Sequence, residues 1–114
     1  MRRCVLIALL ATPALAQLPA FPGAEGAGAF ATGGRNGTIY RVTNLNLRGA
    51  GSLADAVSRP DRIIVFTVSG TLDLSAGTKR KGSLLIAPPN ITIVGQTAPG
   101  EGICLQGGAL HRGL

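Results

Sequence analysis

The sequence predicts an all-β fold made of many short strands, and two observations lead to this prediction. Glycine is abundant, with 17 residues in 114, and tryptophan is absent; this composition favours tight turns over a helical bundle. The second half of the chain contains only brief runs rich in Val, Ile and Leu, each too short for a stable helix. We predict strands at Ile63–Val68, Thr71–Leu74, Ser83–Ala87, Asn90–Val94, Gly102–Gln106 and Ala109–Arg112.

These six strands recur as a unit of three. The starts pair at offsets of 28, 32 and 26 residues: Ile63 with Ile91, Thr71 with Ile103, and Leu84 with Leu110. Such a repeat is typical of a parallel β-helix, in which each coil stacks on the next. An antiparallel sandwich of the same strands is the alternative that periodicity leaves open.

Three features precede the repeat. Leu18–Gly37 is small, apolar and rich in glycine, and it predicts an irregular arm that lies over another part of the fold. Thr38–Thr43 alternates in polarity and predicts a half-buried strand. Ser52–Ser58 predicts a short helix, with Ser52 as N-cap, Asp55 completing a capping box, and Pro60 ending it.

The strand residues predict where side chains lie. The continuous apolar run Ile63–Phe66 is expected where both faces of a sheet are covered. Cys104 stands between Ile103 and Leu105 and is expected to be buried as a small hydrophobe. Coil corners with unusual backbone angles are expected at five glycines: Gly70, Gly82, Gly95, Gly100 and Gly102.

The first sixteen residues have the organisation of a secretory signal peptide. Arg2 and Arg3 precede a short apolar stretch, and the small residues before Gln17 predict cleavage between Ala16 and Gln17. Residues 17–114 then form one domain with nine basic and five acidic residues, a net charge of +4. No later segment is apolar for long enough to span a membrane, so we expect a soluble, exported product without an internal disulfide.

A series of short motifs runs in a fixed order along the chain after the signal peptide. The motifs are Phe21–Gly26, Thr32–Arg35, Val42–Asn46, Gly51–Leu53 with Asp55–Val57, Val68–Thr71, Asn90–Ile93, Gly95–Gly100 and Gly102–Cys104. Their order and spacing, over about Phe21 to Ala109, resemble the opening of the pectate lyase-like polysaccharide lyases.

This resemblance implies a right-handed parallel β-helix whose N-terminal end is closed by the helix at Ser52–Ser58. It also implies an extracellular enzyme that cleaves polygalacturonate by β-elimination, in which acidic side chains hold calcium and an arginine removes the C5 proton. In the family an Asp-Ser pair follows the asparagines, where this chain has Leu47-Arg48. The family's calcium-binding aspartates and catalytic arginine lie in later coils, whereas this sequence reaches Leu114 after about two coils. No catalytic, cofactor-binding or metal-binding residue is therefore assigned, and the chain alone is expected to be an inactive fragment.

The alternative function is a non-catalytic secreted module that binds an acidic polysaccharide. Lys79, Arg80 and Lys81 form the densest charge of the chain and are its candidate contact for a polyanion, although a solvated turn explains them equally well. The other basic residues are scattered and aromatic residues are few, which argues against nucleic-acid binding. We expect a monomer.

The remaining candidates have simpler explanations. Gly26–Ala31 matches a dinucleotide-binding pattern but lacks the flanking strand and helix, and His111 has no nucleophile partner in a recognisable setting. Asn36 and Asn90 begin two formal N-glycosylation sequences; the Asn90 amide is expected to bond to backbone groups at a coil corner. Five acidic residues are spread singly, without the clustered oxygens that calcium requires: Glu25, Asp55, Asp61, Asp73 and Glu101.

Overall fold

The structure is a computed structural model that describes residues 17–76 and 83–113. The chain divides into two compact units, Met1–Ala31 and Thr32–Leu114. In the first unit the described residues form turns, and the Ala20 N–H donates a hydrogen bond of 2.7 Å to the Ala29 carbonyl. The predicted signal peptide lies outside the described residues, as does the Lys79–Lys81 cluster.

The second unit contains the helices and strands of the described chain, each of them short. All of the predicted strands appear within two residues of their expected bounds at both ends. The elements in order are β1 Thr38–Val42, α1 Leu53–Ala56, β2 Arg62–Phe66, β3 Gly70–Asp73, η2 Leu74–Ala76, β4 Ser83–Ile86, β5 Ile91–Val94, η3 Gly95–Thr97, β6 Ile103–Gln106 and β7 Ala109–Arg112. Among the described residues, no helix has the length and apolar character needed to cross a membrane.

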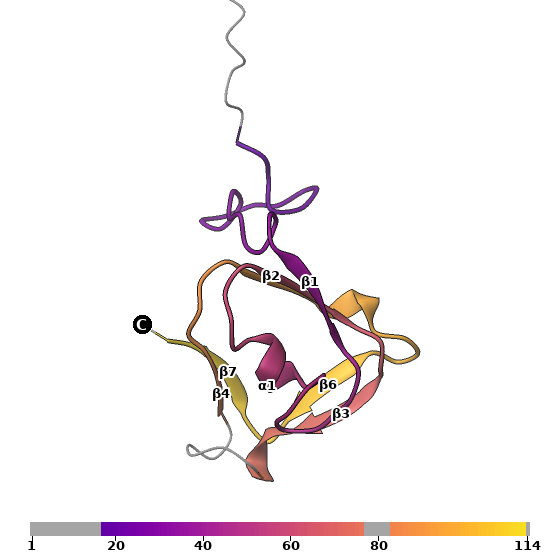
Figure 1. The fold of residues 1–114 in the computed structure, drawn as a ribbon. Helices are drawn as coiled ribbons and strands as arrows, with labels where there is room; N and C mark the ends of the chain where they lie inside the picture. Colours follow the sequence, from indigo (N-terminus) through magenta and orange to yellow (C-terminus); the bar gives the residue numbers. More distant parts are fainter. Residues whose placement is uncertain (1–16, 77–82, 114) are drawn as a thin grey trace, which may run out of the picture. The chain divides into compact units, whose positions relative to one another are not determined.

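The strands form three small parallel sheets that the chain visits in rotation. Sheet A has the order β1-β2-β5, sheet B pairs β3 with β6, and sheet C pairs β4 with β7. Each pairing is parallel. From β2 to β7 the chain passes through A, B and C twice, and Figure 1 shows the three sheets as three sides around α1. This parallel arrangement excludes the antiparallel sandwich.

The register differs by one residue from the predicted repeat in two of the sheets. Leu84 lies beside Leu110 as predicted, but Ile91 lies beside Arg62 instead of Ile63, and Ile103 lies beside Gly70 instead of Thr71. The offsets in sheets A and B are therefore 29 and 33 residues. Because strand side chains alternate between faces, the correction reverses the inward-facing residues of one strand in each of these pairs relative to its partner.

Sheet A gains a third strand that the predicted repeat did not contain. β1 pairs with β2, so that Tyr40 lies beside Ile64 and Val42 beside Phe66. Val42 is 1% exposed and Ile64 is fully buried. The apolar run Ile63–Phe66 could bury either pair of its alternate residues. The pairing with β1 decides between them, because Ile64 and Phe66 lie beside the inward-facing Tyr40 and Val42.

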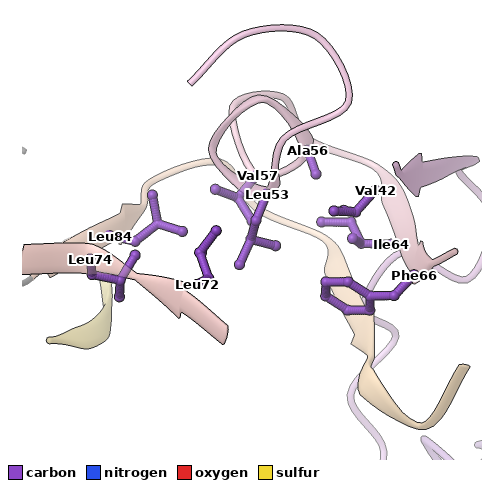
Figure 2. Close-up of a cluster of buried hydrophobic side chains, with 9 residues drawn as sticks. All are labelled: Val42, Leu53, Ala56, Val57, Ile64, Phe66, Leu72, Leu74 and Leu84. Carbon is purple, nitrogen blue, oxygen red and sulfur yellow. The ribbon is translucent and has the colours of Figure 1, made fainter. Parts of the chain in front are cut away.

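The hydrophobic core lies between the three sheets and under α1. Figure 2 shows side chains from all these elements pointing toward one another. Full burial of each large aliphatic or aromatic side chain stabilises the fold by about 1.5–3 kcal/mol. The buried members are Val42, Leu53, Ala56, Val57, Ile64, Phe66, Leu72, Leu74 and Leu84, and the next coil adds partly buried Ile91, Ile93, Ile103 and Leu105.

Helix α1 covers one end of this core. Ser52 is its N-cap, and the Ser52 hydroxyl accepts a hydrogen bond from the Asp55 N–H at 3.2 Å. Leu53, Ala56 and Val57 are buried against the strands. Only half of the predicted capping box forms, because the Ser52 N–H donates to the Gly49 carbonyl instead of to the Asp55 carboxylate. α1 is also shorter than the predicted Ser52–Ser58 helix.

Successive coils meet at a close-packed corner before the strands of sheet A. Asp61 and Asn90 both have a φ of 59°, in the left-handed region, and the Asn90 Nδ2 donates a hydrogen bond of 3.0 Å to Asp61 Oδ1. The expected partner was backbone, so this prediction was wrong. Gly37 is the equivalent residue before β1, and a Cβ there would lie 1.8 Å from the Asp61 carbonyl oxygen. Of the predicted corner glycines, positive φ is found at Gly70, Gly100 and Gly102, not at Gly95, while Gly82 lies outside the described residues.

Residues 32–37 lie against the outer face of sheet A. The Gly34 N–H donates a hydrogen bond of 2.8 Å to the Thr92 hydroxyl, and a Cβ at Gly34 would lie 1.9 Å from the Arg62 carbonyl oxygen. No side chain fits between this segment and the strand, so glycine is required. This part of the predicted irregular arm does lie over another element, as expected.

Candidate functional site

The most connected polar cluster of the described chain lies where α1 meets sheet A. We call it the cap cluster, and it consists of Tyr40, Gly51, Asp55 and Arg62. The Tyr40 hydroxyl donates a hydrogen bond of 2.5 Å to Asp55 Oδ2 and accepts one of 2.9 Å from the Gly51 N–H. Tyr40 lies on the inward face of β1, so its ring packs beside the core and its hydroxyl reaches the helix.

Arg62 holds the other end of the same helix. Its Nη1 donates to the carbonyl oxygens of Asp55 and Ala56, at 2.8 and 2.9 Å. A cation at these carbonyls also complements the negative end of the helix. The guanidinium carbon lies 4.7 Å from the centroid of the Tyr40 ring, within the range of a cation–π interaction.

The electrostatics of the cap cluster favour a neutral Tyr40. The hydrogen bond to the Asp55 carboxylate raises the pKa of the Tyr40 hydroxyl above its ordinary value of 10.0, and desolvation adds to this effect. The Gly51 N–H and the charge of Arg62 act in the opposite direction. A phenol held in its protonated form, with its donor and acceptor sites both occupied, anchors a helix and is not available as a general base.

Sequence reasoning missed the cap cluster. It assigned Asp55 to the helix N-terminus and gave no role to Tyr40 or Arg62. The alternation of side chains along the strand could have located the cluster, because it places Tyr40 on the same inward face as Val42. A tyrosine that faces inward needs a hydrogen-bond partner for its hydroxyl.

The acidic side chains that could hold a metal ion are dispersed, and the aspartates among them are engaged with other partners. Asp61 accepts from Asn90, and Asp73 Oδ1 accepts from the N–H and hydroxyl of Ser75 at 2.9 and 2.6 Å. These bonds lower the pKa of Asp73 below its ordinary value of 3.8. Glu25 and Glu101 are exposed.

Among residues 17–76 and 83–113, no three His, Cys, Asp or Glu side chains lie close enough together to hold a metal ion. The described residues therefore do not themselves provide the clustered oxygen ligands that calcium binding requires.

Two further candidates from the sequence lie on the outside of the strands. Cys104 is exposed, and its prediction as a buried residue was wrong. Leu105 lies beside the buried Leu72 and points inward, so its neighbour in the strand points outward. His111 is also exposed and lies beside Leu85, and nothing in the described structure gives it a nucleophile to activate.

The Gly26–Ala31 segment forms turns, without the preceding strand and following helix that a dinucleotide site needs among the described residues.

The fold and its polar contacts together indicate an architectural class. Parallel coils stack around an apolar interior, a short helix covers one end, and the polar clusters join backbone segments instead of converging on an open site. The described strands thus form small parallel sheets that are consistent with part of a parallel β-helix.

Comparison with known proteins confirms the resemblance found in the motifs: the chain is homologous to fungal pectate lyases. It is 51% identical over 104 residues to a probable pectate lyase C of Aspergillus fumigatus, covering 90% of this chain and 23% of that protein. Proteins of the same description from Aspergillus terreus and Emericella nidulans are 53% and 52% identical, over 82% and 79% of this chain and 20% of each relative.

The chain thus spans between a fifth and a quarter of the length of these relatives. No protein-family model matches the chain. No solved structure matches it significantly.

Proposed function

We propose that this chain is the capped, opening part of a secreted pectate lyase-like protein that cleaves polygalacturonate by calcium-assisted β-elimination. In this proposal the described residues are the first coils of a right-handed parallel β-helix, and their role is to close and nucleate the column. The proton-abstracting and calcium-binding groups belong to the portion of the lyase that this chain does not match.

The observation that carries the proposal is the identity of about half of all residues to the probable pectate lyases C, over nine-tenths of the chain. Two features of the fold support it independently. The rotation of the chain through three parallel sheets provides successive rungs on which further coils can stack. The helix α1 closes one end of the apolar interior, as a solenoid requires at its terminus.

The arrangement of polar groups supports a scaffold role for these residues. The cap cluster uses its charges to fix α1 on β1 and β2, and Asp61 and Asn90 join two successive coils. Calcium-assisted elimination needs clustered oxygen ligands, and the described residues hold no such cluster. Export through the residue 1–16 signal, with cleavage before Gln17, completes the proposal.

The test is a hybrid enzyme. The matching region of the Aspergillus fumigatus relative is replaced by the corresponding residues of this chain, and purified hybrid, parent and isolated chain are incubated with polygalacturonate and calcium. Ultraviolet absorbance of the unsaturated product reports elimination. We expect activity from the hybrid, loss of that activity when calcium is chelated, and none from the isolated chain.

Two outcomes separate the alternatives. A hybrid that melts cooperatively like the parent yet lacks activity would sink the proposed function. Elimination by the isolated chain would overturn the scaffold role. Calorimetric binding of polygalacturonate to the isolated chain, weakened by salt, would instead support the non-catalytic polysaccharide-binding module, whose candidate contact is the Lys79–Lys81 cluster.

A further inference from the structure

The two N-glycosylation sequences of the chain lie in different surroundings, although both begin with an exposed asparagine. Asn36-Gly37-Thr38 leads into β1, and Asn90-Ile91-Thr92 leads into β5. Both asparagines are exposed. An N-linked oligosaccharide is carried by the amide of an asparagine that a Ser or Thr follows two residues later, and because the group is bulky a folded protein accommodates it at the surface.

The side chains of the first glycosylation sequence are not engaged in the described hydrogen bonds of the fold. Within the described residues the Asn36 side chain makes no hydrogen bond. Thr38 is exposed as well. β1 is also the edge strand of sheet A, since β2 pairs with only one of its sides and no described strand pairs with the other. A sugar attached at Asn36 would therefore stand on an exposed side chain and displace no hydrogen bond within the described part of residues 32–113.

In the second glycosylation sequence, both the asparagine and the threonine make side-chain hydrogen bonds that hold the fold together. The Asn90 Nδ2, the atom that would carry the sugar, donates to Asp61 Oδ1 at 3.0 Å, and its backbone is held at a φ of 59°. The Thr92 hydroxyl accepts from the Gly34 N–H at 2.8 Å, beneath the segment that lies over sheet A. A sugar on Asn90 would stand at the stacked corner and compete with the bond that joins two coils.

We propose that Asn36 is an N-glycosylation site and that Asn90 is not. The reaction transfers an oligosaccharide from a lipid pyrophosphate donor. A bond forms between Asn36 Nδ2 and the first sugar carbon, the bond from that carbon to the pyrophosphate oxygen breaks, the amide loses one proton, and the lipid pyrophosphate leaves. The proposal rests on the proposed export, because the donor and its transferase belong to the secretory pathway of eukaryotic cells.

The test expresses the full chain in a secreting yeast and identifies intact glycopeptides of the secreted protein by mass spectrometry. Intact glycan masses are required because Asn-Gly sequences deamidate spontaneously and mimic the product of enzymatic glycan removal. We expect one glycan, attached at Asn36. Asn36→Gln and Thr38→Ala should both remove it, whereas Thr38→Ser and the matched control Asn90→Gln should retain it.

A second arm separates failure of export from failure of the site. Each variant is also translated in the presence of microsomes, once with residues 1–16 and once with a strong foreign signal peptide in their place. Protease protection reports translocation, and a mobility shift reversed by endoglycosidase reports the glycan. A chain that is protected only with the foreign signal would overturn the proposed export while still testing Asn36. Translocated chain without a glycan at Asn36, or secreted protein with a glycan at Asn90, would overturn the proposal.

Discussion

Replacing Ile64 by alanine tests the register of sheet A, because the structure and the predicted pairing of Ile63 with Ile91 disagree about which residues of β2 face the core. Ile64 is fully buried, whereas its neighbour Ile63 is partly exposed on the other face. The change from Ile to Ala removes about three buried carbon groups at about 0.8 kcal/mol each, a transfer cost of about 2.4 kcal/mol. The cavity left among Val42, Phe66 and Leu53 brings the expected loss of unfolding free energy to about 3–4 kcal/mol.

The measurement is urea unfolding of the purified chain, followed by far-ultraviolet circular dichroism and by the fluorescence of Tyr40, the single tyrosine of a chain without tryptophan. Ile63→Ala is the matched control and should cost about 1 kcal/mol. Ile64→Val, expected to cost about 0.5–1.5 kcal/mol, supplies a measurable value if the alanine variant is unfolded. Equal losses at the two positions, or a larger loss at Ile63, would refute the assigned inward face.

Four further predictions follow from the polar contacts and close approaches. Tyr40→Phe should lower the unfolding free energy by about 1–2 kcal/mol, because the hydroxyl both donates and accepts; an unchanged urea midpoint would contradict this. Since the folded pKa of Tyr40 is raised, its contribution to stability should be complete below the ordinary value of 10.0 and lost as the pH rises through the raised pKa, and Asp55→Ala should bring the spectroscopic titration of the phenol to lower pH. Gly37→Ala should cost about 1–3 kcal/mol through collision with backbone, while Gly95→Ala, with nothing within 4 Å, should change stability by less than about 0.5 kcal/mol; similar thermal shifts would count against the close approach. Cys104 should react with a thiol reagent in the native chain about as fast as in urea, and strong protection of the thiol would show that it is not exposed.

The sequence could predict the rotation of strands through three sheets but not the phase of every strand. In sheet C the predicted register was correct, and the buried Leu84 lies beside Leu110. In sheet A the run Ile63–Phe66 satisfies both phases equally, and the choice depends on β1, which the repeat did not include. The orientation of Cys104 failed for the same reason, since apolar neighbours on both sides give no alternation.

The candidate site was predictable to a smaller extent. The motifs identified the homology, because short strings in fixed order carry information that composition lacks. The pairing of Tyr40 with Asp55 depends on a contact between residues 15 apart that meet only once α1 has packed on β1. Local capping rules predicted that the Asp55 carboxylate bonds to the helix N-terminus, whereas in the structure it accepts a hydrogen bond from the Tyr40 hydroxyl.

The position of α1 in the chain, between β1 and β2, has a consequence for synthesis on the ribosome. The paired strands β1 and β2 and the helix α1 all lie within residues 38–66, so these three elements can assemble before any residue of β5 has been made. The strands β5, β6 and β7 each pair with a strand that lies 26 to 33 residues earlier in the chain. Folding can therefore proceed during translation from the helix-covered end, with each new strand adding to the free edge of a sheet that is already formed.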